Sequence, residues 1–134
     1  MEMHFFIPLK KIPTVTHQEQ GVAVVNGKPR IYDSAALKSA RGLFTAHLAK
    51  YRPDEPLRGP VRLVTKWIYP ATSTHKPNTW KITRPDTDNM IKLFKDCMTR
   101  CSFWDDDSQV CSEVTQKFYG CTSGIYVEIE EITE

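Results

Sequence analysis

Residues 1–134 are predicted to form a single α+β domain, with two helices packed on one mixed, mostly antiparallel β-sheet. Two segments, starting near Ser34 and Thr87, carry apolar side chains at helical spacing. Residues 125–132 alternate apolar and polar side chains, as a half-buried strand does. The length of 134 residues is sufficient for one domain with its own core, and 40% hydrophobic and 25% charged residues are ordinary for a globular protein.

The first expected elements are a strand and a β-hairpin. Residues 3–9 are apolar, but they are too short for a transmembrane span and are not preceded by the basic segment of a signal peptide. We therefore predict a strand there, no membrane segment and a cytoplasmic protein. The apolar residues 22–25 are followed by Asn26-Gly27, a strong hairpin signal, and by residues 28–32. These residues predict a β-hairpin.

A helix, a strand and a loop follow. Ser34 is a favourable N-cap for a helix that reaches roughly Lys50. Three prolines between residues 53 and 60 indicate a loop, and the alternation over residues 61–69 predicts a strand. Residues 71–83 are polar and predict a flexible loop containing basic residues and Trp80. This loop either tracks DNA strands by charge and stacking or folds Trp80 onto the core.

The second helix has clear boundaries in the sequence. Pro85 disfavours helical backbone at Arg84, and Asp86 is a good N-cap for a helix from about Thr87. Its apolar stripe comprises Met90, Ile91, Phe94, Cys97, Met98 and Cys101. Residues 108–118 and 125–132 are then expected to form a final hairpin around Gly120 and Gly124.

Acidic residues flank this second helix. Asp86 and Asp88 lie at its start, Lys92 shares a face with Asp88, and residues 105–107 are three consecutive aspartates beyond its end. Crowded carboxylates repel one another, and hard cations such as Mg²⁺ take carboxylate oxygens as ligands. A helix folded back onto a sheet is expected to bring Asp107 beside Asp86 and Asp88. The sequence thus indicates a divalent-cation site.

Each part of this pattern also has a purely structural interpretation. Asp86 and Asp88 can serve only as an N-cap and a first-turn acid that complements the helix dipole. Lys92 can be only a helix-surface partner of Asp88, and residues 105–107 can form a solvated turn. The joint pattern favours the cation site over these separate interpretations.

The same residues resemble the signature of the RusA-type endodeoxyribonucleases, which are Holliday-junction resolvases of bacteria and their phages. The resemblance is strongest over residues 84–118 and consists of Asp86-x-Asp88-Asn89-x-x-Lys92, then Asp96, then Phe103-Trp104-x-Asp106-Asp107-x-Gln109-Val110. It implies that Asp86, Asp88 and Asp107 are the catalytic metal ligands and that Lys92 is the essential lysine. Asp106 and Asn89 fall at supporting positions, and Asp105 stands where the family often has an apolar residue.

The resemblance also implies an activity and its partners. The expected reaction is phosphodiester hydrolysis with one or two Mg²⁺ ions per site, for which Mn²⁺ can substitute, giving paired nicks across a four-way DNA junction in recombination and repair. A homodimer with two active sites is implied, with no nucleotide cofactor. The residues expected to contact DNA are Lys28, Arg30, Lys76, Lys81 and Arg84, the first two lying in a segment similar to a basic loop of the family.

Charge is distributed unevenly along the chain. Residues 1–85 contain 14 Lys and Arg against 5 Asp and Glu, a net charge of +9, whereas residues 86–134 contain 4 against 11, a net charge of −7. A basic half beside a compact acidic site suits a protein that binds phosphate backbones and cuts them with a metal. Basic residues that only solvate a surface would give the same totals.

Three other classes of protein share parts of the pattern. An EF-hand loop needs Gly at its sixth and Glu at its twelfth position, but counting from Asp86 gives Ile91 and Cys97. A metal-dependent sugar or phosphoryl transferase usually has a Gly-rich phosphate loop, which this sequence lacks. The four cysteines lack the paired C-x-x-C spacing of a zinc site, so we predict that they are reduced thiols. The remaining alternative is a DNA-binding protein of the same fold that is catalytically inactive or does not act on junctions.

Overall fold

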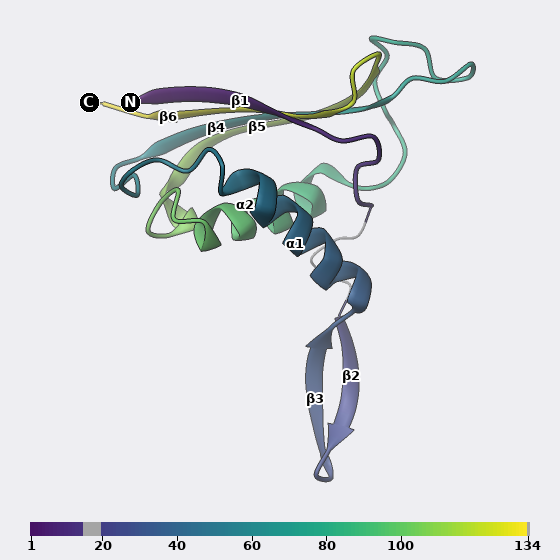
Figure 1. Cartoon of the computed structure of the whole chain (residues 1–134), viewed down its shortest axis with the longest axis vertical. Helices are drawn as coiled ribbons and strands as arrows, with labels where there is room; N and C mark the ends of the chain where they lie inside the picture. Colours follow the sequence, from purple (N-terminus) through teal and green to yellow (C-terminus); the bar gives the residue numbers. More distant parts are fainter. Residues whose placement is uncertain (15–19, 134) are drawn as a thin grey trace.

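A computed structural model describes residues 1–14 and 20–133. A four-stranded sheet has the strand order β1-β6-β4-β5, and a separate two-stranded sheet pairs β2 with β3. Both helices lie on one face of the main sheet, and the β2–β3 hairpin projects away from it (Figure 1). The elements are β1 (Glu2–Pro8), β2 (Gln20–Val25), β3 (Lys28–Asp33), α1 (Ala35–Leu48), β4 (Val61–Pro70), α2 (Thr87–Arg100), the 3₁₀ turn η1 (Asp107–Gln109), β5 (Val110–Gly120) and β6 (Gly124–Glu131).

The predicted order of strands and helices is confirmed, but the predicted final hairpin is wrong. β5 and β6 do not pair with each other, because β4 lies between them. β5 pairs with β4 in parallel, whereas β6 is antiparallel to both β4 and β1. A parallel neighbour requires a crossover connection, which α2 supplies between β4 and β5. The Ile- and Val-rich β6 therefore occupies a central position in the sheet.

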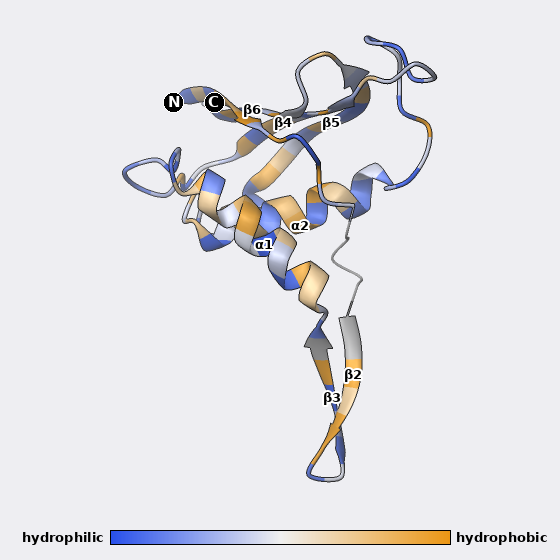
Figure 2. Ribbon diagram, turned by 45° about the vertical axis from the view of Figure 1, so that its right-hand side comes forward, coloured by the Kyte–Doolittle hydropathy of each residue, from blue (hydrophilic) through white to orange (hydrophobic). Residues whose placement is uncertain are grey.

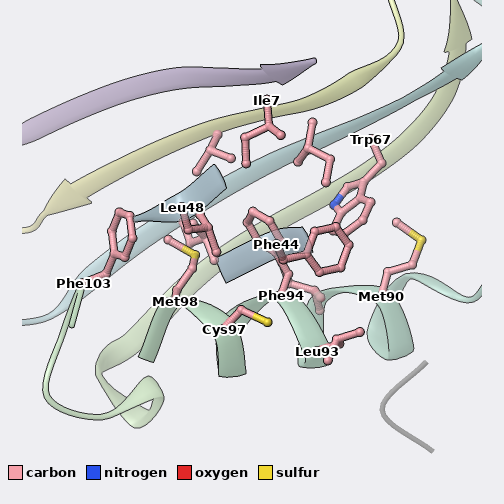
Figure 3. Close-up of a cluster of buried hydrophobic side chains, with 14 of the residues drawn as sticks. Ile7, Phe44, Leu48, Trp67, Met90, Leu93, Phe94, Cys97, Met98 and Phe103 are labelled. Atoms are coloured by element: carbon pink, nitrogen blue, oxygen red, sulfur yellow. The ribbon is translucent and has the colours of Figure 1, made fainter. Parts of the chain in front are cut away.

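The core lies between the helices and the main sheet (Figure 3). Phe44 from α1, Trp67 from β4 and Phe94 from α2 form mutual edge-to-face contacts with ring centroids 5.4–6.0 Å apart. All six residues of the predicted α2 stripe are buried, and Leu93 is buried as well. Packing of this stripe fixes which face of α2 meets the sheet and leaves Asp88 and Lys92 exposed.

The start of α1 joins the hairpin to the main body. Ser34 is the N-cap, as predicted, and its side-chain oxygen accepts a hydrogen bond from the Leu37 N–H at 3.1 Å. Arg41 of α1 forms an ion pair with Asp33 at the end of β3, and its Nε lies 3.6 Å from Asp96 of α2. These contacts connect β3, α1 and α2.

The predicted β-hairpin is confirmed and lies outside the main sheet. Asn26 and Gly27 form its turn with positive φ angles of 53° and 76°, as the Asn-Gly signal requires. Val22, Val24 and Ile31 are exposed on it, and hydrophobic residues are visible along the hairpin in Figure 2. Across residues 1–14 and 20–133, no helix has the length and apolar character needed to span a membrane.

Candidate functional site

The entry to α2 presents two exposed carboxylates. Asp86 occupies the N-cap position, as predicted, with extended backbone (φ −71°, ψ 145°), but its side chain accepts no capping hydrogen bond. Asp88 lies in the first helical turn, where the helix dipole favours negative charge. Within the described chain neither carboxylate forms an ion pair. The capping interpretation of Asp86 therefore lacks its hydrogen bond, and both groups are available to an external ligand.

Lys92 lies one helical turn beyond Asp88 and is exposed. In the part of the chain that the structure describes, it forms no ion pair with Asp88, so the helix-surface interpretation of Lys92 is not supported. By contrast Lys95, also on α2, pairs with Glu113 of β5 at 2.8 Å. Among the described residues the Lys92 ammonium group therefore has no carboxylate partner, and it lies on the same side of α2 as Asp88.

Lys117 of β5 fixes the segment that leads into α2. Its Nζ donates hydrogen bonds to the carbonyl oxygens of Thr83 and Pro85, each at 2.6 Å. The Lys81 N–H donates to the Lys117 carbonyl at 3.1 Å, and the Arg84–Pro85 peptide bond is cis. Sequence reasoning missed Lys117 because main-chain carbonyl partners leave no signal in the side-chain pattern.

Lys117→Met, which keeps most of the apolar stem but removes the ammonium group, is expected to lower the free energy of unfolding by roughly 1–3 kcal/mol because two charge-assisted hydrogen bonds are lost. Denaturant unfolding measures this change. Lys95→Met is the matched control and removes a part-exposed ion pair, which is worth at most about 1 kcal/mol. Equal unfolding midpoints for the two variants would show that the carbonyl contacts do not hold the segment.

The acidic turn after α2 is held by its own hydrogen bonds. Asp106 caps η1 and accepts the Ser108 N–H at 3.0 Å, and this backbone hydrogen bond lowers the pKa of Asp106. Gln109 accepts the N–H groups of Asp105 and Asp106, each at 2.9 Å, and donates through Nε2 to carbonyl oxygens at positions 57 and 59. All three aspartates are exposed, and Asp106 is the one whose side chain caps the turn.

The structure separates Asp107 from Asp86 and Asp88 within one chain. The 14 residues of α2 span about 21 Å, with Asp86 at the start and η1 after the end. Lys117 contacts Pro85 near the last residues of β5, whereas η1 directly precedes the first residue of β5. Among residues 1–14 and 20–133, no group of three or more His, Cys, Asp or Glu side chains is placed to hold a metal ion. The expected convergence therefore does not occur in the single chain, because α2 runs back along the sheet as a full-length helix.

The expected DNA-contacting residues fall into two groups. Lys76, Lys81 and Arg84 lie on the connection from β4 to α2, where the Lys81 ammonium sits over the rings of Tyr69 and Tyr119 at 4.9 and 5.5 Å from their centroids. The other group, on β3, is exposed in the projecting hairpin (Figure 1) and comprises Lys28 and Arg30. Only the group on the β4–α2 connection lies on the segment that leads directly into α2.

Comparison with known proteins identifies relatives over almost the whole chain. The sequence model of a family described as Endodeoxyribonuclease RusA matches residues 11–130. A crossover junction endodeoxyribonuclease rusA from Lactococcus phage r1t is 31% identical over 134 residues, covering 98% of this chain and 100% of that protein. The uncharacterized protein YqaN of Bacillus subtilis (strain 168) is 29% identical over 122 residues, covering 83% of this chain and 85% of that protein.

Proposed function

Because this chain belongs to the RusA family of endodeoxyribonucleases, we propose that it is a Mg²⁺-dependent nuclease that resolves four-way DNA junctions by paired nicks. The observation that carries the proposal is the pair of exposed, unpaired carboxylates of Asp86 and Asp88 at the start of α2 in the described structure. A role in DNA recombination and repair follows from this substrate.

The entry to α2 fits a hard divalent cation. Asp86 and Asp88 offer only oxygen donors, and Mg²⁺ is usually held by one or two carboxylates together with water and substrate phosphates. When bound, Mg²⁺ neutralises charge on the phosphate and lowers the pKa of a water nucleophile. Mn²⁺ is expected to substitute because carboxylate oxygens suit it as well.

A homodimer would complete the ligand set. Asp107 of one chain lies beyond the far end of α2 from Asp86 and Asp88, so the three carboxylates meet only if Asp107 comes from a second copy. A twofold axis that sets two α2 helices antiparallel would bring the start of each helix to the acidic turn of the other. Such an assembly has two equivalent sites, as two nicks in a twofold-symmetric junction require.

In such a dimer, different residues of the chain would bind the metal, position its ligands and contact the phosphate. Asp86 and Asp88 of one subunit and Asp107 of the partner subunit would hold the metal, and the Asp106 cap would orient the turn that carries Asp107. Lys92 projects from the same end of α2 as Asp88 and would contact the scissile phosphate as a point charge in the transition state.

Lys92→Ala is expected to lower the cleavage rate by about 10²–10³-fold, the loss typical of removing one group that stabilises transition-state charge. Junction affinity should change far less, because the contact strengthens only as the transition state forms. Single-turnover cleavage and gel shifts in Ca²⁺ measure the two quantities. Lys95→Ala, on the same helix but paired with Glu113, should cut at nearly the wild-type rate. A wild-type rate for Lys92→Ala would remove this residue from the mechanism.

The proposed function is tested by incubating the protein with an end-labelled four-way junction or a linear duplex of the same sequence, with Mg²⁺ or with EDTA. Paired cuts in the junction, dependent on Mg²⁺ and absent from the duplex, are the expected result. Cuts in EDTA would contradict metal dependence. Tight binding without cuts under any condition would favour the alternative, a DNA-binding protein that keeps this fold without the chemistry.

A further inference from the structure

The face of the main sheet opposite the helices carries a pocket next to the connection between β4 and α2. Its volume is about 250 Å³, and it is lined by Lys66, Asn78, Trp80, Gln116 and Phe118. Thr65 and Trp67, the neighbours of Lys66 in β4, are buried on the helix side, so Lys66 points to the opposite face. Neither helix covers that face (Figure 1). The pocket is therefore accessible in the single chain.

Trp80 lies on a part of the β4–α2 connection that is hydrogen-bonded to the edge of β5. The Asn78 N–H donates to the Tyr119 carbonyl at 2.8 Å, and the Tyr119 N–H donates to the Thr79 carbonyl at 2.9 Å, so this segment follows the edge of β5. The Trp80 ring meets Phe118 nearly perpendicularly, at 86° and 6.0 Å between centroids. It is nevertheless 65% exposed. Trp80 thus presents a positioned aromatic surface and is not folded into the core.

The residues that line the pocket offer three kinds of contact suited to a nucleotide. An indole face stacks on a base, and the amides of Asn78 and Gln116 can donate to and accept from base edges. The Lys66 side chain lines the pocket, and its ammonium, which lies over the Tyr126 ring at 5.6 Å from the centroid, suits a phosphate at the pocket's rim. No carboxylate lines the pocket, which favours an anionic ligand. The volume falls below the roughly 300–1,000 Å³ of pockets that enclose drug-sized ligands, so a single base fits better than a larger molecule.

We propose that this pocket binds one unpaired nucleobase of the DNA substrate, stacked on Trp80, with its edge on Asn78 and Gln116 and its phosphate on Lys66. The proposal rests on the proposed function, since Trp80 precedes Asp86 by only six residues and Lys117 fixes the segment between them. Bases inside a duplex are stacked and paired and cannot enter. The pocket therefore favours DNA whose bases are already unpaired, as at a branch point opened by binding.

The first test uses the protein's own fluorescence. Trp67 and Trp104 are each 1% exposed, whereas Trp80 is 65% exposed, so iodide quenches mainly Trp80. In EDTA, a saturating five-nucleotide oligothymidylate is expected to protect Trp80 from iodide. An abasic oligonucleotide with the same number of phosphates should not protect it. Full iodide quenching with saturating oligothymidylate, or protection that grows with protein concentration without DNA, would overturn the proposal.

The second test separates base recognition from charge. Trp80→Leu is expected to weaken oligothymidylate binding by roughly 5- to 100-fold, because base stacking on an aromatic ring is lost, while abasic binding stays unchanged. Trp80→Phe should recover part of the loss. Lys66→Gln should weaken binding to both oligonucleotides alike and lower the salt slope by about one unit. Ile82→Ala, at a 91% exposed position outside the pocket, is the matched control.

If Trp80→Leu lowers the affinity for base-bearing and abasic DNA equally, or lowers neither affinity, the base-binding pocket is refuted. The junction cleavage assay keeps the two proposals distinct. Mg²⁺-dependent cutting with no Trp80 effect would reject the pocket alone. Protection of Trp80 in a protein that cuts no junction would reject the nuclease activity while retaining the base pocket.

Discussion

Replacing Asp88 or Asp86 by asparagine is expected to lower junction cleavage at least about a hundredfold, because a metal's stabilisation of transition-state charge is worth several kcal/mol. The loss should arise without loss of fold. Asparagine caps a helix about as well as aspartate, and the Asp86 side chain accepts no capping hydrogen bond in any case. Asp107→Asn should lose activity to a similar extent if it supplies the third ligand.

Binding and stability separate the metal site from a structural role. Junction affinity in EDTA should be kept or tightened in these variants, because a negative charge near the phosphates is removed. The melting temperature in EDTA should change little, because asparagine is an equally good N-cap at position 86 and, at position 88, relief of carboxylate repulsion opposes the lost helix-dipole interaction. Asp105→Asn, in the same turn as Asp107, is the matched control and should cut normally. Wild-type cutting by Asp86→Asn or Asp88→Asn would refute the metal-site assignment. An inactive Asp105→Asn together with an active Asp107→Asn would instead move the third ligand to Asp105.

Mixing Asp88→Asn protein with Asp107→Asn protein is expected to restore cleavage that neither variant has alone. In a mixed dimer, one site combines Asp86 and Asp88 from one subunit with Asp107 from the other, all intact, while the second site carries both substitutions. If subunits exchange freely, half of the dimers are mixed and each has one intact site, so about a quarter of the wild-type sites should return. The products should be unpaired single nicks.

The control for this experiment is a mixture of Asp86→Asn with Asp88→Asn. Asp86 and Asp88 come from the same subunit in each site, so every site of a mixed dimer carries one of the two substitutions. No intact site forms, and no activity should return. Light scattering should show about twice the 15.4 kDa chain mass for the wild type and for each variant. No recovery from the Asp88 and Asp107 mixture, despite proven subunit exchange, would contradict a site shared between subunits.

The sequence by itself determined the local elements and which charged side chains stand at the entry to α2. The stripe from Met90 to Cys101, the Ser34 cap and the Asn26-Gly27 turn each depend on residues within a few positions of one another, and the structure has them as expected. Asp88 and Lys92 share one end of α2 for the same reason, because helical spacing alone determines which side chains share a face.

Only the tertiary structure decided the contacts between distant segments. The alternation in β6 fits a hairpin with β5 as well as it fits a central strand, and the parallel pairing of β5 with β4 depends on the path of α2 between them. That path also sets the start of α2 and the Asp107 turn a helix length apart, brings Lys117 to main-chain carbonyls and leaves Trp80 open on the uncovered sheet face. Such contacts arise from the packing of whole elements, and no short stretch of sequence encodes them.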